Sequence, residues 1–228
     1  MNKPRILIIN PNSSAEMTEA IHKNAVAFAG EDMEITTVPT PGAPPFIGTY
    51  EDHFMAAPGM VQILREREKD YDAIIVACHS DPNLDLMKEL AHKPVVGISE
   101  ASMKMATMLG HSFSVLAPME RTVPNKKALV DKYGLSRDLA SVCPGSVEKG
   151  TDLAERLTAA GRRALMEDGA EVLVLGCAGF AGLDKRIEKE LGAPVLDGVI
   201  CALIIASGLV RYGVSISKVR RYATGESK

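Results

Sequence analysis

The sequence predicts an α/β protein built from two similar lobes, each a parallel sheet with flanking helices. First, short apolar runs alternate with segments of helical periodicity along the whole chain, which favours βαβ units. Second, the chain contains an internal repeat with a period of roughly one hundred residues, which is too long for a solenoid. Third, 228 residues of which 46% are hydrophobic can bury a substantial core.

Strands and helices are predicted from these patterns and from the residues that bound them. The predicted strands are 5–10, 72–77, 94–98, 112–117, 171–175 and 194–196. The predicted helices are 15–29, 56–68, 84–91, 100–109, 125–133, 153–167 and 184–191.

The repeat is clearest around two of the four cysteines. The run Asp-Ala-Ile-Ile-Val-Ala-Cys ends at Cys78, and the matching run Glu-Val-Leu-Val-Leu-Gly-Cys ends at Cys177. A Leu-Asp pair and a Pro-Val pair follow both runs at similar distances. We therefore expect a first lobe of residues 1–98 plus 205–228 and a second lobe of residues 99–204.

This arrangement has a consequence for the cysteines. Ligands of open α/β sheets bind beyond the carboxyl ends of the strands, and each cysteine directly follows a predicted strand. Two lobes related by a pseudo-twofold axis would bring Cys78 and Cys177 to opposite sides of one active-site cleft.

Two opposed thiols suit the inversion of a stereocentre next to a carbonyl. That reaction needs a base on one face of the carbon and an acid on the other, and a thiol with a pKa of roughly 8.5 is close to neutrality. We expect Ser80 or Asp81 to cap a helix near Cys78, whose N-terminus would lower the thiol pKa. The sequence thus predicts a cofactor-independent racemase with Cys78 and Cys177 as its catalytic residues.

The other two cysteines serve as internal controls, because a buried cysteine often only fills space. Cys143 is expected in a Pro/Gly loop and Cys201 in an apolar helical run, and neither has a counterpart in the repeat. Neither is assigned a catalytic role.

Several polar or small residues are predicted to contact the substrate at the same edge. Asn10 closes the first strand, and Ser13 follows it as a ligand residue or, with Ser14 as the other candidate, a helix cap. Thr122 holds the equivalent place in the second lobe, where it binds a carbonyl or amide group or caps the next helix.

Four further candidates adjoin the cysteines. His79 and Ser80 follow Cys78, and the backbone N–H groups of Ala178 and Gly179 are expected to stabilise an enolate oxygen. The proline-rich segment 39–48 is either a lid or an ordinary surface connection.

Composition and motifs exclude several other classes. The net charge of −3 and the pI near 6.0 give no basic field for a nucleic acid or an anionic membrane. The sequence has no HExxH, CxxC or glycine-rich nucleotide motif, so we expect no metal and no cofactor. Without a signal peptide or a membrane span, a cytoplasmic enzyme acting on a small molecule is expected.

The motifs resemble those of the aspartate/glutamate/hydantoin racemase superfamily, and within it the hydantoin and allantoin racemases. The matching segments are Asn-Pro-Asn-Ser-Ser at 10–14, Ala-Cys-His-Ser-Asp-Pro at 77–82, Val-Gly-Ile-Ser-Glu-Ala at 96–101, Leu-Gly-Cys-Ala-Gly at 175–179 and Pro-Val-Leu-Asp-Gly at 194–198. The resemblance implies two pseudo-symmetric lobes, cofactor-free two-thiol catalysis and a homo-oligomer.

The sequence departs from the family pattern beside the first cysteine. His79 and Ser80 stand where the branch usually has an aromatic residue and a glycine, Asn83 replaces a glycine, and Phe180 replaces a methionine. A more polar wall next to Cys78 favours a polar 5-substituted hydantoin such as allantoin, or a related imide.

Four alternatives remain beside this interpretation. An amino acid racemase usually carries Asn-Thr or Thr-Glu next to its cysteines, and arylmalonate decarboxylase uses only one of them. Maleate isomerase keeps both cysteines and is harder to dismiss. A non-enzymatic two-lobed binding protein leaves the matched pair unexplained.

Overall fold

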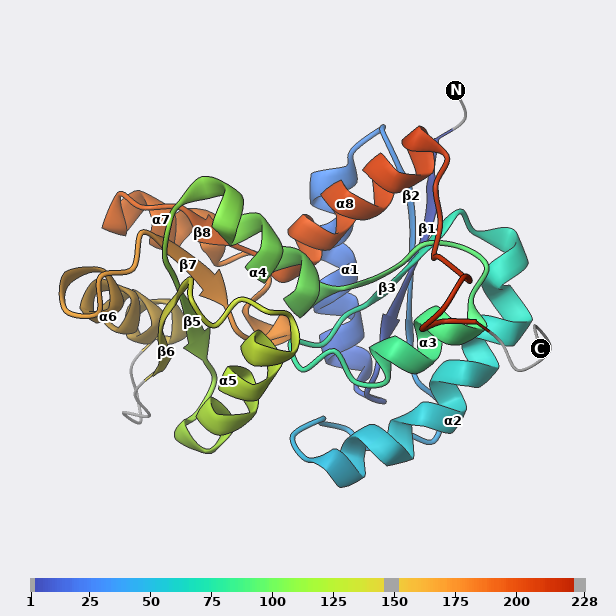
Figure 1. Cartoon of the computed structure of the whole chain (residues 1–228), viewed down its shortest axis with the longest axis horizontal. Coiled ribbons are helices and arrows are strands. Elements are labelled where there is room, and N and C mark those ends of the chain that lie inside the picture. Colours follow the sequence, from blue (N-terminus) through green and yellow to red (C-terminus); the bar gives the residue numbers. More distant parts are fainter. Residues whose placement is uncertain (1–2, 146–151, 224–228) are drawn as a thin grey trace. The chain divides into compact units, whose positions relative to one another are not determined.

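The computed structural model describes residues 3–145 and 152–223 (Figure 1). The chain divides into two compact units, one formed by residues 1–98 with 202–228 and the other by residues 99–201. In the described residues, each unit contains one four-stranded sheet in which every neighbouring pair of strands is parallel. The α/β class with two similar parallel sheets is therefore confirmed.

The sheet of the first unit has the strand order β2-β1-β3-β4. Its strands are β1 (Arg5–Asn10), β2 (Glu34–Pro39), β3 (Ala73–Val76) and β4 (Val95–Gly97). Its helical segments are α1 (Ala15–Ala29), α2 (Tyr50–Arg67), η1 (Glu68–Asp70) and α3 (Leu84–Leu90).

Alternation along the strands gives this sheet two buried faces. Leu7 and Ile9 of β1 pack with Ile74 and Val76 of β3 against residues of α2 and α3. Ile6 and the other alternate residues of β1 are also fully buried, and they point to the opposite face. Helices therefore cover both faces and leave the strand ends as the place for polar side chains.

The second unit has the equivalent strand order β6-β5-β7-β8. Its strands are β5 (Phe113–Ala117), β6 (Leu139–Pro144), β7 (Val172–Leu175) and β8 (Val195–Leu196). Its helical segments are α4 (Ile98–Leu109), η2 (Glu120–Thr122), α5 (Val123–Lys132), α6 (Leu153–Met166), η3 (Ala178–Phe180) and α7 (Asp184–Leu191). The matching orders confirm that β1, β2, β3 and β4 correspond to β5, β6, β7 and β8.

The largest differences from the sequence prediction are two strands, the start of α2, and helix α8 (Gly198–Tyr212), which was expected only as an apolar helical run around Cys201. Neither β2 nor β6 was predicted, because both lie at a sheet edge, end in proline and are only partly buried, so their apolar signal is weak. Helix α2 begins at Tyr50 instead of residue 56, since Thr49 and Asp52 form a capping box. Pro58 is accommodated within this helix.

The C-terminal part of the chain returns to the first unit. Helix α8 (Gly198–Tyr212) crosses the boundary between the units in sequence. Beyond it, Lys218 Nζ donates to the carbonyl oxygens of Lys88 and Glu89 at 2.8 and 2.7 Å, and Tyr222 donates to Asp85 at 2.8 Å. These bonds hold the segment after α8 against α3, with a lysine at the carbonyl end of that helix.

Candidate active site

The two half-buried cysteines occupy equivalent positions in the two units. Cys78 follows the end of β3 by two residues, and Cys177 follows the end of β7 by two residues. β3 pairs with β1 and β4, whereas β7 pairs with β5 and β8. Each thiol therefore lies at the carboxyl edge of its own sheet, where α/β proteins bind ligands.

The segment after Cys78 is a tight turn with no helix at its start. The Asp81 N–H donates to the Cys78 carbonyl at 2.9 Å, and Asp81 and Asn83 both have positive φ, at 43° and 57°. Helix α3 begins only at Leu84, and its N-cap is Asn83 without a side-chain cap. The prediction that Ser80 or Asp81 caps a helix near Cys78 is therefore wrong, because the turn leaves the helical path and the N-cap of α3 is Asn83.

Ser80 lies beside the first thiol. Its Oγ is 3.3 Å from the Cys78 Sγ, and the residue is half-buried. A hydroxyl can donate to a thiolate or accept from a thiol. Ser80 can therefore hydrogen-bond to Cys78 in either protonation state of the sulfur.

His79 is buried, with only 2% of the residue exposed. Its contact with the substrate stays a prediction.

The second thiol receives a hydrogen bond from its own loop. The Gly179 N–H donates to the Cys177 Sγ over 3.4 Å, so that Cys177 caps the short 3₁₀ helix η3. Burial raises the pKa of Cys177, and this N–H and the positive charge of Lys126 oppose that rise by lowering it. The Gly179 N–H, predicted to bind an enolate oxygen, is thus directed at the sulfur, while Ala178 is buried at 6% exposure.

A carboxylate fixes the rest of this loop. Asp197 follows β8 and is 3% exposed; its Oδ2 accepts from the Gly182 N–H at 2.9 Å, and its Oδ1 from the Val199 N–H at 2.8 Å. The same side chain therefore ties the Cys177 loop to the start of α8.

Asn10 has a structural role in this conformation. It is fully buried, and its amide nitrogen donates to Asn12 Oδ1 at 2.8 Å and to Thr18 Oγ1 at 2.9 Å. Both amide hydrogens are engaged, so the side chain holds this loop together. Its contact with the substrate stays a prediction.

Of the two neighbouring serines, Ser14 caps the helix that follows and Ser13 does not. Ser14 is the N-cap of α1 and accepts from the Met17 N–H at 3.2 Å. Ser13 is exposed, and its N–H donates to the Pro44 carbonyl at 3.1 Å. Ser13 is thus exposed, and its backbone hydrogen bond connects the proline-rich segment 39–48 to the same loop.

Thr122 stands at the N-cap position of α5 but does not cap it. Its hydroxyl donates to the Met119 carbonyl at 2.7 Å. The oxygen keeps lone pairs that can accept a hydrogen bond.

The control cysteines are buried. Cys143 lies in strand β6 and not in a loop, and its Sγ donates to Asp168 Oδ2 at 3.3 Å. Cys201 lies in α8, and burial, together with Asp197 and Asp184, raises its pKa to about 12. A thiol with such a pKa is a poor base at neutral pH.

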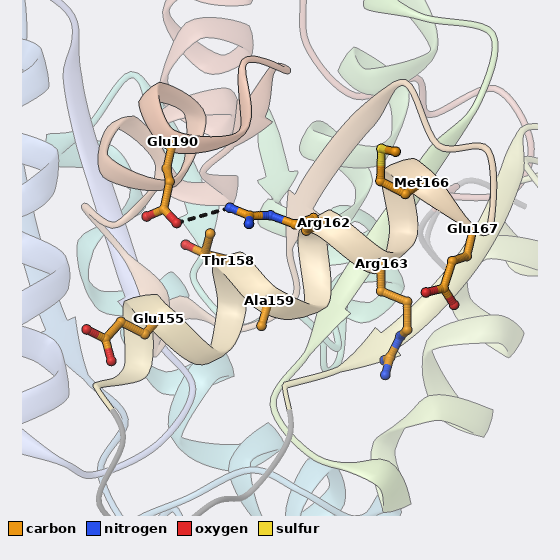
Figure 2. A pocket seen from close by; sticks show the side chains of 8 residues that line it. All are labelled: Glu155, Thr158, Ala159, Arg162, Arg163, Met166, Glu167 and Glu190. Carbon is orange, nitrogen blue, oxygen red and sulfur yellow. Dashed lines mark hydrogen bonds and ion pairs between the residues drawn. The ribbon is translucent and has the colours of Figure 1, made fainter.

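A separate hollow lies on the second unit (Figure 2). It is formed by α6 with Glu190 of α7, and Arg162 pairs there with Glu190 at 3.2 Å. None of the predicted site residues lines it.

Two further properties concern only the residues that the structure describes. They contain no cluster of histidine, cysteine or acidic side chains suited to a metal ion. No helix among them is long and apolar enough to cross a bilayer.

Sequence reasoning missed Lys126 and Asp197. Lys126 is 6% exposed. The signal was available, because Lys126 stands three residues after Val123 and four before Val130, on the apolar stripe of α5.

Comparisons with known proteins identify the family. The family model Asp/Glu/Hydantoin racemase matches residues 6–206. The hydantoin racemase of Pseudomonas sp. (strain NS671) is 36% identical, over 98% of this chain and 93% of its own length.

Two solved structures are similar in sequence and in fold. Allantoin racemase from Klebsiella pneumoniae is 38% identical with a TM-score of 0.91, covering 99% of this chain and 95% of that chain. Allantoin racemase from Pseudomonas fluorescens is 35% identical with a TM-score of 0.90, covering 98% of both chains. The chain therefore belongs to the Asp/Glu/hydantoin racemase family and is an enzyme of the racemase type.

Proposed function

We propose that this racemase interconverts the enantiomers of a 5-substituted hydantoin, with allantoin as the first candidate, and that it needs no cofactor. The observation that carries the proposal is the equivalence of Cys78 and Cys177: two half-buried thiols, each two residues beyond the corresponding strand of two sheets of the same order. The names of the similar proteins, hydantoin racemase and allantoin racemase, support the substrate class.

In the proposed reaction, the substrate binds with one thiol on each face of the ring. One cysteine, as thiolate, removes the proton from C5, and the electron pair of the C–H bond passes to the adjacent carbonyl oxygen to give an enolate. The other cysteine, as thiol, delivers its proton to the opposite face of C5. One proton leaves and one arrives, so the product is the mirror image and the two sulfurs have exchanged protonation states.

Nearby residues supply the polar contacts of this proposal. The Ser80 hydroxyl supports Cys78 through its 3.3 Å contact, and the Gly179 N–H supports the thiolate of Cys177. Ser13 and Thr122 are proposed to bind the ring carbonyl and N–H groups, because their hydroxyls lie in the loops that follow β1 and β5.

The test uses enantiopure allantoin and enantiopure 5-substituted hydantoins in heavy water. Optical rotation reports racemisation and mass spectrometry reports deuterium at C5, with a blank lacking enzyme to subtract spontaneous exchange. Cys78→Ser and Cys177→Ser should each abolish racemisation, and each should retain exchange with only the enantiomer whose hydrogen faces the remaining thiol. A single-thiol variant that racemises at a near wild-type rate would overturn the two-base mechanism.

The assembly state is a separate proposal. We expect a homo-oligomer, as the family resemblance implies. Light scattering coupled to size exclusion would measure its mass, and a single-chain mass at micromolar concentration would contradict this expectation.

A further inference from the structure

The unit that holds Cys177 contains a buried cation, and the equivalent helix position of the first unit carries no charge. Helix α5 contributes a buried lysine, Lys126, to the unit that holds this cysteine. Lys126 is 6% exposed on the apolar stripe of this helix. Solvent and salt screen the charge of a buried group much less than that of an exposed one.

Lys126 has a counterpart in the other unit at the same distance from the helix N-cap. Helices α1 and α5 follow the equivalent strands β1 and β5, and their N-caps are Ser14 and Thr122. Four residues beyond each N-cap stand Thr18 and Lys126, which are 8% and 6% exposed. The same buried place in the first turns of the two helices thus holds a neutral hydroxyl in one unit and a cation in the other.

The contacts of Thr18 indicate what this helix position faces. Thr18 Oγ1 accepts a hydrogen bond of 2.9 Å from Asn10, the last residue of β1. The position therefore looks onto the carboxyl end of the first strand of its unit. In the second unit that strand is β5, whose neighbour β7 leads to Cys177.

The charges around Cys177 agree with this placement. The positive charge of Lys126 lowers the pKa of Cys177, in the same direction as the Gly179 N–H and against the effect of burial. The acidic side chains of this region, Asp197 and Asp184, act on Cys201 instead. Among the described residues, Lys126 is thus the charged group that favours the thiolate form of Cys177.

We propose that Lys126 is a positioning residue of the racemase that acts through Cys177, keeping this sulfur available as a thiolate at neutral pH. The inference rests on the proposed function, in which Cys177 is one of the two bases.

The direct test measures the reactivity of Cys177 without any substrate. Iodoacetamide labelling of the full-length protein, followed across pH by peptide mass spectrometry, gives the profile of this thiol separately from the other three. Lys126→Met keeps most of the aliphatic chain and removes the charge. We expect Cys177 to react about three- to tenfold more slowly at pH 7, with its profile shifted to higher pH.

Two variants make the comparison specific. Lys127→Met removes an exposed charge from the next position of α5 and should leave the Cys177 profile unchanged. Lys126→Arg keeps the charge and should restore most of the reactivity. Circular dichroism and thermal unfolding of all three variants show whether the fold is intact.

Racemase activity provides a second readout. Because thiolate forms by itself at high pH, the loss of kcat in Lys126→Met should be greatest at low pH and should disappear as the pH approaches that of a free thiol. A folded Lys126→Met with an unchanged Cys177 profile overturns the inference, and so does a rise in KM without a change in labelling, which would make Lys126 a substrate ligand. If labelling shifts as expected but the wild type racemises no hydantoin, the proposed function fails and the role of Lys126 beside Cys177 stands.

Discussion

The carboxylate of Asp81 lies where a side chain at Gly97 would stand. A Cβ added to Gly97 would be 2.5 Å from Asp81 Cγ and 2.5 and 2.7 Å from its two oxygens. Asp81 belongs to the turn that starts at Cys78, whereas Gly97 ends β4. The absence of a side chain at Gly97 therefore makes room for the turn that carries the first thiol.

Gly97→Ala should consequently damage the protein both in stability and in activity. The added methyl group must displace the buried Asp81 carboxylate, and overpacking of this kind costs about 1–3 kcal/mol. A displaced Asp81 also moves the turn that positions Cys78, so racemisation should fall more than the loss of folded protein explains. Thermal unfolding and activity per folded molecule measure the two effects.

Gly208→Ala is the matched control for this substitution. Gly208 lies in α8, and an added Cβ would meet nothing within 4 Å. Alanine is favoured over glycine inside a helix by about 1 kcal/mol, so this variant should be as stable as the wild type or more stable. Equal melting temperatures for Gly97→Ala and the wild type would contradict the tight contact.

Ser80→Ala tests the support of the first thiol. A hydrogen bond to a charged group contributes about 1.5–3 kcal/mol, so loss of the hydroxyl 3.3 Å from Cys78 Sγ should lower kcat by about tenfold or more. Exposed Ser136→Ala is the control and should leave kcat unchanged. An unchanged kcat in Ser80→Ala, at constant labelling of Cys78, would assign Ser80 to the structure of the turn alone.

The two buried cysteines should matter for stability and not for catalysis. Cys143→Ala removes a partner of Asp168 and Ser141, which should cost about 1–3 kcal/mol. Cys201→Ala leaves a small cavity in α8 and should cost about 1 kcal/mol. Denaturant unfolding gives both values, and racemisation per folded molecule should equal that of the wild type; a large loss of activity in Cys201→Ala would revise its role.

Asp184 should make stability depend on pH in the direction opposite to an ordinary ion-paired carboxylate. Burial, and next the nearby Asp197, raise the pKa of Asp184 above its usual value. The folded protein therefore binds this proton more tightly than the unfolded chain does. The stabilisation that protonated Asp184 gives the folded protein is therefore fully present below the pKa of the unfolded chain. It is lost as the pH rises through the higher pKa of the folded protein.

Asp184→Asn removes this dependence and should be more stable than the wild type at pH 7. The advantage should shrink as the pH falls and Asp184 becomes protonated. Melting temperatures from pH 4 to pH 8 measure the difference, with exposed Asp32→Asn as the control. A difference in melting temperature between Asp184→Asn and the wild type that stays constant over this range would contradict the shift.

The strongest local patterns predicted the central elements of both sheets. The apolar runs of β3 and β7 are buried on both faces, so their hydrophobicity is continuous and visible in one dimension. The edge strands β2 and β6 carry threonine or serine and are largely half-buried. They form because β1 and β5 offer them backbone partners, and a pairing partner far away in the chain leaves no local signal.

In the candidate site, too, some features have a local signal in the sequence and others do not. The equivalent positions of Cys78 and Cys177 were predicted from the sequence, because each stands at the same point of a repeated run. Asn10, Ser13 and Ser14 were placed correctly in one loop. Their different roles depend on hydrogen bonds that the spacing does not reveal: Ser13 bonds to Pro44 and stays exposed, Ser14 accepts from Met17 as a helix cap, and buried Asn10 donates to Thr18. Those partners are chosen by the folded chain and not by spacing.

By itself, the sequence determined the α/β class, the duplicated strand-turn-helix unit and the equivalent positions of the two cysteines, because each of these follows from local composition or from a repeat. Only the tertiary structure decided that the Asp81 carboxylate fills the space at Gly97, that Asp197 holds the Cys177 loop, and that Lys126 is buried in the unit that contains Cys177. Each of these relationships joins residues from different elements. The parallel pairing of β3 with β4, of β7 with β8 and of β5 with β7 brings them together, and such long-range pairing is a property of the whole fold.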